Sequence, residues 1–165
     1  MIEKLTKKDI QKIEEEIKHR KLVIRPKALS DLKSARAQGD LSENFEYYAA
    51  KKFNRENNSR IMYLEKMIKN AQIIDYEEKD GEVCLNDIIK IKILEDNTIE
   101  EYKITTSIRG DSVNGRISIE SPLGKSCLGK KVGDIVTINI SENFNYNIEI
   151  ISIVKDKTDD SIRQF

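Results

Sequence analysis

The chain has 165 residues and no net charge, and it is 38% hydrophobic and 35% charged. This length suffices for one ordinary domain or two small ones, and so polar a composition favours an elongated molecule over a compact sphere. We expect no membrane-spanning segment and no signal peptide, because the apolar runs are only a few residues long. Residues 1–75 hold 17 Lys and Arg against 12 Asp and Glu, a net +5, so this half is the better candidate for contact with nucleic acid.

The chain has too few cysteine and histidine residues for a disulfide framework, a zinc site or a His-based catalytic site. Cys84 and Cys127 are solitary, without the spacing of zinc ligands or of a disulfide framework, and we expect both to be buried, reduced thiols of a cytoplasmic protein. His19 is the only histidine and lies in a charged helical stretch. This excludes His-based metal sites and catalytic triads.

A first long helix is predicted up to Gly39. Thr6 followed by Asp9 resembles a capping box, and apolar residues then recur at helical spacing. Pro26 should bend this helix or restart it with Pro26 in the first turn. The predicted apolar stripe is Ile10, Ile13, Ile17, Ile24, Ala28, Leu29, Leu32 and Ala35.

A second helix is predicted after the turn "GDLSEN". Its stripe begins with Phe45, Tyr48, Ala49 and Phe53, becomes polar through "NRENNSR", and resumes in a coiled-coil pattern at Ile61, Leu64, Ile68 and Ala71. Two long stripes joined by a short turn must run antiparallel. We therefore predict a helical arm over residues 1–75, on the order of 45 Å long.

Residues 76–165 predict a small antiparallel sheet with one short helix. β-Branched residues alternate with polar ones in segments such as "DIIKIKIL" and "DIVTINI", separated by turn signals. Ser121 is a candidate N-cap, Pro122 suits the first helical position, and Gly129 can close a two-turn helix. The predicted class is α+β, with a linker at 76–82, a domain at 83–155 and a frayed tail at 156–165.

The turn between the helices raises a question about its acids. Gly39 can end the first helix, while Asp40 can cap the second with Glu43 completing a capping box. Neither position needs an acid for that role, since Ser or Thr caps as well. Two carboxylates at the end of an arm are also hard oxygen ligands suited to Mg²⁺, too few to hold it tightly alone. Such a pair can complete a metal site that another protein half-builds.

Both halves of the chain resemble one family. The stretch "ARAQGDLSENFEYYAAKKFN" with "SRIMYLEKMIKNAQIID" resembles the arm of the bacterial Gre transcript cleavage factors, GreA and GreB, and "SPLGKSCLGKKVGDIVTI" resembles their C-terminal motif. The similarity runs from about residue 5 to residue 154. Sparse basic residues along the arm favour the GreA-like subtype.

The resemblance implies a long coiled-coil hairpin followed by an FKBP-like domain. That domain would dock on RNA polymerase through "SPLG", and the arm would enter the secondary channel and reach the 3′ end of backtracked RNA. Asp40 and Glu43 match the family's two tip acids, which help to hold a second Mg²⁺ shared with the polymerase. The chain would then activate cleavage by the polymerase, as a cytoplasmic monomer and not as an enzyme itself.

Further positions carry over from the family motif or flank it. Tip-shaping or active-site contacts are expected from Asn44, Glu46 and Tyr47. Contacts with RNA are expected from Arg36, Lys51, Lys52, Arg55 and Arg60, although a solvated helix face explains these cations equally well. The docking residues are Ser121, Pro122, Leu123 and Gly124.

Three other functions stay open. A protein of the same fold can occupy the channel and inhibit without inducing cleavage. A prolyl isomerase or chaperone is disfavoured by the few aromatic residues of the C-terminal half, which supply no apolar proline pocket. A structural coiled-coil adaptor would have no use for an acidic turn.

Overall fold

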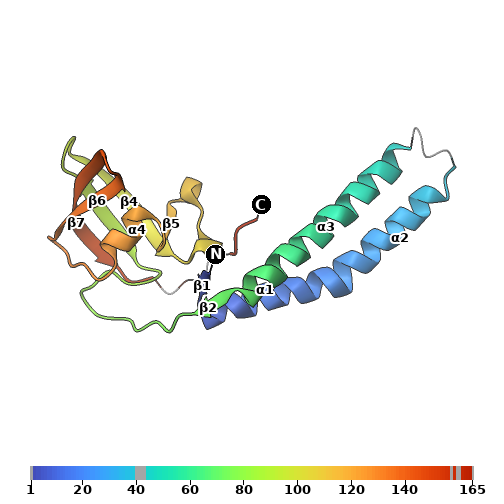
Figure 1. Cartoon of the computed structure of the whole chain (residues 1–165), viewed down its shortest axis with the longest axis horizontal. Helices are drawn as coiled ribbons and strands as arrows, with labels where there is room; N and C mark the ends of the chain where they lie inside the picture. The colour runs from blue at the N-terminus through green and yellow to red at the C-terminus, as the bar shows by residue number, and fades with distance from the viewer. Residues whose placement is uncertain (1, 40–43, 157, 159–160, 165) are drawn as a thin grey trace. The chain divides into compact units, whose positions relative to one another are not determined.

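The computed structural model describes residues 2–39, 44–156, 158 and 161–164. The chain divides into a helical unit, Met1–Glu3 with Lys7–Gln72, and a β unit, Lys4–Thr6 with Ile73–Phe165. Figure 1 shows the long helices of the first unit and the curled sheet of the second. This confirms the predicted α+β class.

The helical unit is an antiparallel hairpin. Its first limb consists of α1 (Lys7–His19), a π-helical turn η1 (Arg20–Ile24) and α2 (Arg25–Arg36), and its second limb is α3 (Phe45–Lys69). Helices α2 and α3 lie side by side (Figure 1). As predicted, the first helix begins directly after Thr6.

The π-helical turn accommodates Pro26. The amide of Arg25 donates to the carbonyl of Arg20, five residues back, and Pro26 lies in the first turn of α2. Proline has no N–H to donate, and in a regular α-helix its ring would crowd the carbonyl four residues back. The wider turn avoids this conflict and lets the limb continue, so Pro26 restarts the helix as one of the two predicted alternatives had it.

The predicted stripe at the start of α3 is wrong. Phe45, Tyr48 and Phe53 are 85%, 51% and 49% exposed. The residues that face the other limb continue the three- and four-residue spacing of Ile61 and Leu64 back towards the turn. They are buried or half-buried, and they are Tyr47, Ala50, Asn54, Asn57, Ile61, Leu64 and Ile68. The register that is set by the apolar end of the helix outweighs the hydrophobicity of the aromatic residues.

The β unit contains a five-stranded sheet in the order β5-β4-β3-β7-β6. The strands and the helix that follows β5 are β3 (Ile88–Ile93), β4 (Thr98–Thr105), β5 (Arg116–Ser118), α4 (Pro122–Cys127), β6 (Ile135–Ser141) and β7 (Phe144–Val154). A separate two-stranded sheet pairs β1 (Glu3–Leu5) with β2 (Ala71–Ile73), and the sequence analysis missed it.

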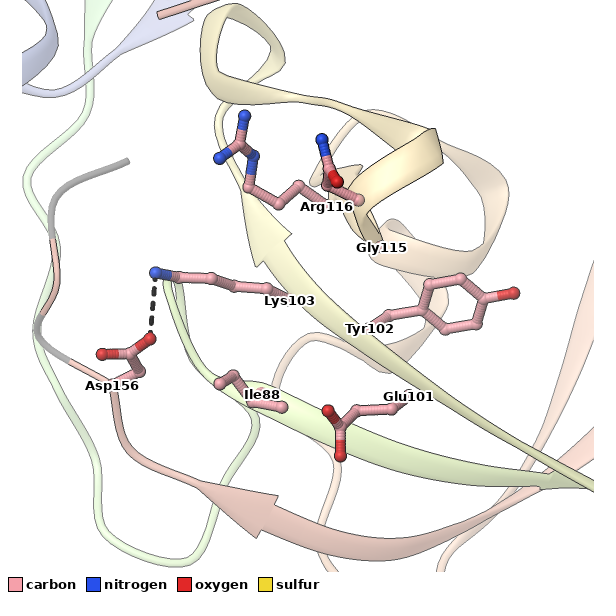
Figure 2. Close-up of a pocket in the computed structure, with 8 residues that line it drawn as sticks. Ile88, Glu101, Tyr102, Lys103, Gly115, Arg116 and Asp156 are labelled. Atoms are coloured by element: carbon pink, nitrogen blue, oxygen red, sulfur yellow. Dashed lines mark hydrogen bonds and ion pairs between the residues drawn. The ribbon is translucent and has the colours of Figure 1, made fainter. Parts of the chain in front are cut away.

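One pairing departs from the predicted antiparallel sheet. β4 and β5 run parallel, with Lys103 directly opposite Arg116 (Figure 2). The two strands are joined by a short connection that contains two 3₁₀ turns, η2 (Ser107–Arg109) and η3 (Ser112–Asn114). Parallel neighbours need a crossover instead of a hairpin, and short 3₁₀ turns allow this one to stay brief.

The core of the β unit is rich in isoleucine from the inward faces of the strands, including Ile89, Ile104, Ile138 and Ile148. Cys127 of α4 joins this core, and both cysteines are buried and free, as predicted. Burial raises the pKa of the Cys127 thiol to about 11. A thiol in such surroundings is structural and unreactive.

The tail is not frayed over its described residues. Ile162 is only 7% exposed, and the amide of Arg163 donates to the carbonyl of Ile108 at 2.7 Å. Asp156 forms an ion pair with Lys103 at 3.1 Å. The low apolar content of the tail predicted fraying. The prediction fails because one buried isoleucine and a few polar contacts are enough to fix the described residues of the tail on the β unit.

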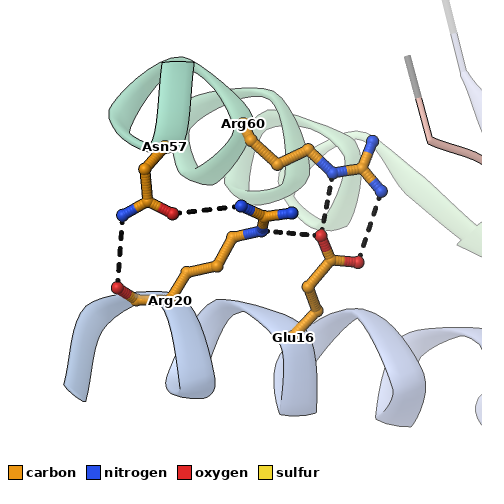
Figure 3. Close-up of polar contacts among 4 residues, drawn as sticks. All are labelled: Glu16, Arg20, Asn57 and Arg60. Carbon is orange, nitrogen blue, oxygen red and sulfur yellow. Dashed lines mark hydrogen bonds and ion pairs between the residues drawn. The ribbon is translucent and has the colours of Figure 1, made fainter. Parts of the chain in front are cut away.

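The middle of the hairpin is held by a polar network (Figure 3). Glu16 accepts from Arg60 through Nε at 2.9 Å and Nη2 at 3.3 Å, and from Arg20 Nε at 2.7 Å. Asn57 accepts from Arg20 Nη1 at 3.0 Å and donates to the Arg20 carbonyl at 3.3 Å. Because Asn57 and Arg60 are each only 2% exposed, these bonds satisfy groups that would be costly to leave unpaired.

We predict that Glu16→Gln lowers the free energy of unfolding by about 1–3 kcal/mol at neutral pH, since it weakens charged hydrogen bonds to two arginines. Burial opposes ionisation of Glu16, but the bonds from Arg60 and Arg20 outweigh it and lower the pKa below the ordinary value of 4.5. This stabilisation is therefore complete above that value and is lost as the pH falls through the lowered pKa.

Urea denaturation followed by circular dichroism, at neutral pH and below about pH 4, measures both effects. Glu15→Gln is the matched control, since Glu15 is on the same helix and its side chain is 57% exposed. Equal losses for the two variants, or a Glu16→Gln loss that persists in acid, would contradict the assigned role.

Candidate functional site at the hairpin turn

The first limb ends in an ordinary helix terminus followed by a glycine. The amide of Ala37 donates to Lys33 at 3.2 Å, and that of Gln38 donates to Ala35 at 3.3 Å. Gly39 has φ of +112°, a conformation that side-chain-bearing residues rarely adopt. The predicted role of Gly39 at the end of the first helix is confirmed. Asp40 and Glu43 lie outside the described residues.

Asn44 begins the second limb, and it corrects the predicted cap. Its Oδ1 accepts from the amide of Tyr47 at 2.9 Å, and its Nδ2 donates to the carbonyl of Ala35 at 2.8 Å. The N-cap of α3 is therefore Asn44 and not Asp40. An amide side chain suits this place because it accepts at the helix start and donates across the hairpin, whereas an ionised carboxylate can only accept.

Tyr47 organises the surface next to the turn. Its ring lies 5.6 Å from the Arg36 guanidinium and 5.9 Å from the Lys51 ammonium, and its centroid is 5.6 Å from that of Tyr48. Cations over an aromatic face are attracted to it. Two expected RNA-contacting residues, Arg36 and Lys51, thus also hold a tyrosine that was expected to shape the tip. Tyr48, which was predicted to be core, is half exposed.

The remaining cations are of two kinds. Lys52 is exposed and forms a loose ion pair with Glu56 at 3.8 Å, and Arg55 is exposed. Arg60 belongs to the buried network with Glu16, so its expected contact with RNA is corrected. The sequence signal for this was its position one residue before Ile61, at the edge of the apolar seam.

The acids of the turn are a candidate pair for Mg²⁺. Glu46 is exposed in the first turn of α3, where the helix dipole favours a negative charge. Among the described residues, no three His, Cys, Asp or Glu side chains gather into a metal site. The carboxylates of Asp40 and Glu43 are hard oxygen donors, and Mg²⁺ usually takes only one or two such ligands from a protein.

The segment Ser121–Gly124 forms the start of α4 as the sequence predicted. Ser121 Oγ accepts from the Gly124 amide at 3.0 Å and donates to the Ser118 carbonyl at 2.6 Å. A Cβ on Gly124 would lie 2.1 Å from the Ser118 oxygen, so only glycine fits. Leu123 packs against the core, while Pro122 is exposed. The segment is thus fixed by Ser121, Leu123 and Gly124. The side chain that it exposes to solvent is that of Pro122.

The fold and the candidate site define a two-part protein: a helical hairpin with acids at its turn in sequence, followed by a curled five-stranded β unit. The family described as "Transcription elongation factor, N-terminal" matches residues 3–73, and "Transcription elongation factor, GreA/GreB, C-term" matches residues 78–155. The chain belongs to the GreA/GreB family of transcription elongation factors.

Named relatives agree with this assignment. The chain is 43% identical to GreA of Thermoanaerobacter pseudethanolicus, over 82% of this chain and 87% of the relative, and 38% identical to GreA of Acholeplasma laidlawii, over 90% and 94%. It is also similar to the crystal structure of GreA factor homolog 1 of Thermus thermophilus, with 22% identity, TM-score 0.44, and coverage of 94% of this chain and 100% of that one. No helix in the described part of the chain is long and apolar enough to cross a membrane.

We predict that Asn44→Asp lowers the stability of the hairpin turn. Aspartate still accepts from the Tyr47 amide but cannot donate to the Ala35 carbonyl, a loss of about 1 kcal/mol. Hydrogen exchange at the amides of Tyr47 and Tyr48 should quicken by roughly fivefold. Asn58→Asp is the control away from the turn, and equal protection in both variants would contradict the bond to Ala35.

Proposed function

We propose that this factor enters the secondary channel of RNA polymerase and stimulates the polymerase's own cleavage of backtracked RNA. Family membership over both halves of the chain supports this proposal. The structural observation that supports a chemical role for the acids most directly is the cap of α3. Since Asn44 performs the capping, the cap of α3 gives no reason for acids at Asp40 and Glu43.

In this proposal, each part of the turn has its own task. Asp40 and Glu43 contribute carboxylate oxygens towards a second Mg²⁺ that the polymerase also holds. When bound, that ion activates a water and stabilises charge at the scissile phosphate. Asn44 fixes where α3 begins, and Tyr47 with its two cations stiffens the surface beside the acids. Lys52 and Arg55 remain exposed and suited to RNA phosphates.

The exposure of Phe45 favours one alternative. This side chain is 85% exposed and directly follows the cap of α3, so a large apolar group lies beside the turn. A factor that enters the channel and fills it without inducing cleavage could use such a group. The same experiment decides between the two functions.

The test is a cleavage assay on a backtracked elongation complex with the cognate polymerase. We predict that Asp40→Asn or Glu43→Gln each loses most of the stimulation, and that the double variant loses nearly all of it, because amides are poor Mg²⁺ ligands. Glu56→Gln, which removes an exposed acid from the middle of α3, should cleave like the parent.

Polymerase binding and hairpin stability should be unchanged in the double variant, since Asn44 supplies the cap. A double variant that cleaves like the parent would refute the metal-binding role. A parent that binds polymerase without inducing cleavage would establish the channel-filling alternative.

The docking role of "SPLG" is tested separately. Pro122→Asp places a charge at the exposed start of α4 without touching the bonds made by Ser121. We expect polymerase affinity to fall by about tenfold or more, as for loss of a central interface residue. Binding measured by fluorescence anisotropy decides this, with Lys125→Asp on the same short helix as the comparison. Unchanged affinity for Pro122→Asp would place the docking surface elsewhere.

A further inference from the structure

Two cations of the β unit lie at directly paired positions on neighbouring strands, far in sequence from the hairpin turn. Lys103 of β4 and Arg116 of β5 are direct partners in the parallel ladder, so their side chains leave the same face of the sheet (Figure 2). Like charges at directly opposite positions repel. Both line an open cavity of about 210 Å³, whose other polar lining includes Asn114 and the carboxylates of Glu101 and Asp156. The pair therefore favours an anion beside it.

Each of the two cations forms an ion pair, and the two carboxylates belong to different segments of the chain. Arg116 lies 3.4 Å from Asp111, which belongs to the short connection between β4 and β5. Lys103 receives its acid from the tail: its ammonium lies 3.1 Å from Asp156 Oδ2, 3.1 Å from the Thr158 carbonyl and 3.2 Å from Thr158 Oγ1. Three acceptors match the three N–H groups of a lysine.

The two tail residues that contact Lys103 are also bonded to each other. Asp156 accepts from the Thr158 amide at 2.9 Å and from its hydroxyl at 2.8 Å. These bonds, with the one from Lys103, lower the pKa of Asp156 to about 2. The carboxylate is therefore ionised at any physiological pH, and protonation does not release it. Only another anion can take its place.

The described residues of the tail make a second contact with the β unit. Beyond Thr158, Ile162 is buried and the Arg163 amide donates to the Ile108 carbonyl, in the same β4–β5 connection that contains Asp111. These described contacts consist of one apolar residue and a few polar bonds. A contact of this size is exchangeable without unfolding the sheet.

We propose that the Lys103–Arg116 pair is a binding site for an acidic peptide segment, and that the tail occupies it in cis through Asp156 and Thr158. The occupant in the structure defines the ligand chemistry: a carboxylate with a hydroxyl residue two positions later. A partner protein with such a segment would displace the tail and bind the β unit at this site. This site is separate from the hairpin turn and does not depend on the function proposed for it.

The test uses the full chain with its tail released by Asp156→Asn and Thr158→Val. The probe is a synthetic peptide of residues 154–165, VKDKTDDSIRQF, and binding is followed by calorimetry and by amide shifts at Lys103 and Gly115. We expect the released variant to bind the peptide at least about tenfold more tightly than the parent, whose site is filled by its own tail. A peptide with Asp156→Asn should not bind.

Two controls separate the site from general charge effects. Lys103→Met in the released background should abolish peptide binding, whereas Lys131→Met, which removes an exposed cation that does not line the cavity, should leave it unchanged. Thermal unfolding verifies the fold of each variant, and Asp156→Asn alone provides a milder release. Equal peptide binding by parent and released chains, no binding by any released chain that remains folded, or equal binding of the neutral peptide would overturn the proposal.

Discussion

The hairpin depends on the pairing of Glu16 with Arg60 across its two limbs. The seam here is polar, so apolar packing alone cannot fix how one limb slides along the other. The pair, supported by Arg20 and Asn57, gives the limbs one register in which the Glu16 carboxylate meets Arg60 and the Asn57 amide meets Arg20. A slip by one turn would bury an arginine without its carboxylate, which is far costlier than a misplaced apolar residue.

That register determines which side chains surround the turn. With Ile61 and Leu64 on the seam, the same spacing carried back along α3 turns Tyr47 inward and leaves Phe45 and Tyr48 in solvent. The bond from Asn44 to Ala35 then closes the hairpin at its end. Asn44 thus joins the two limbs beside the turn, and the cap of α3 does not require the acids of the turn.

In the β unit, too, buried residues fix the positions of the side chains to which we assign binding roles. Its isoleucine core and the tight fit of Gly124 against Ser118 fix the segment that we assign to docking. At the edge of the sheet, the parallel pairing of β4 with β5 sets Lys103 against Arg116, and the tail supplies a compensating carboxylate. The two protein-contact sites that we propose on this unit differ in chemistry: an exposed proline lies at one and paired cations lie at the other.

The sequence by itself determined the α+β class, the antiparallel hairpin, the short capped helix after Ser121 and the family, because these rest on local periodicity, caps and motifs. At Pro26 it left a bend and a restart open, and the structure shows the restart. Only the tertiary structure decided the face of α3, the cap at Asn44, the burial of Arg60 and the docking of the tail. Each of these depends on contacts with another segment of the chain. For a charged or aromatic residue, the local sequence does not determine whether the side chain is buried or exposed, because either outcome is possible until those contacts form.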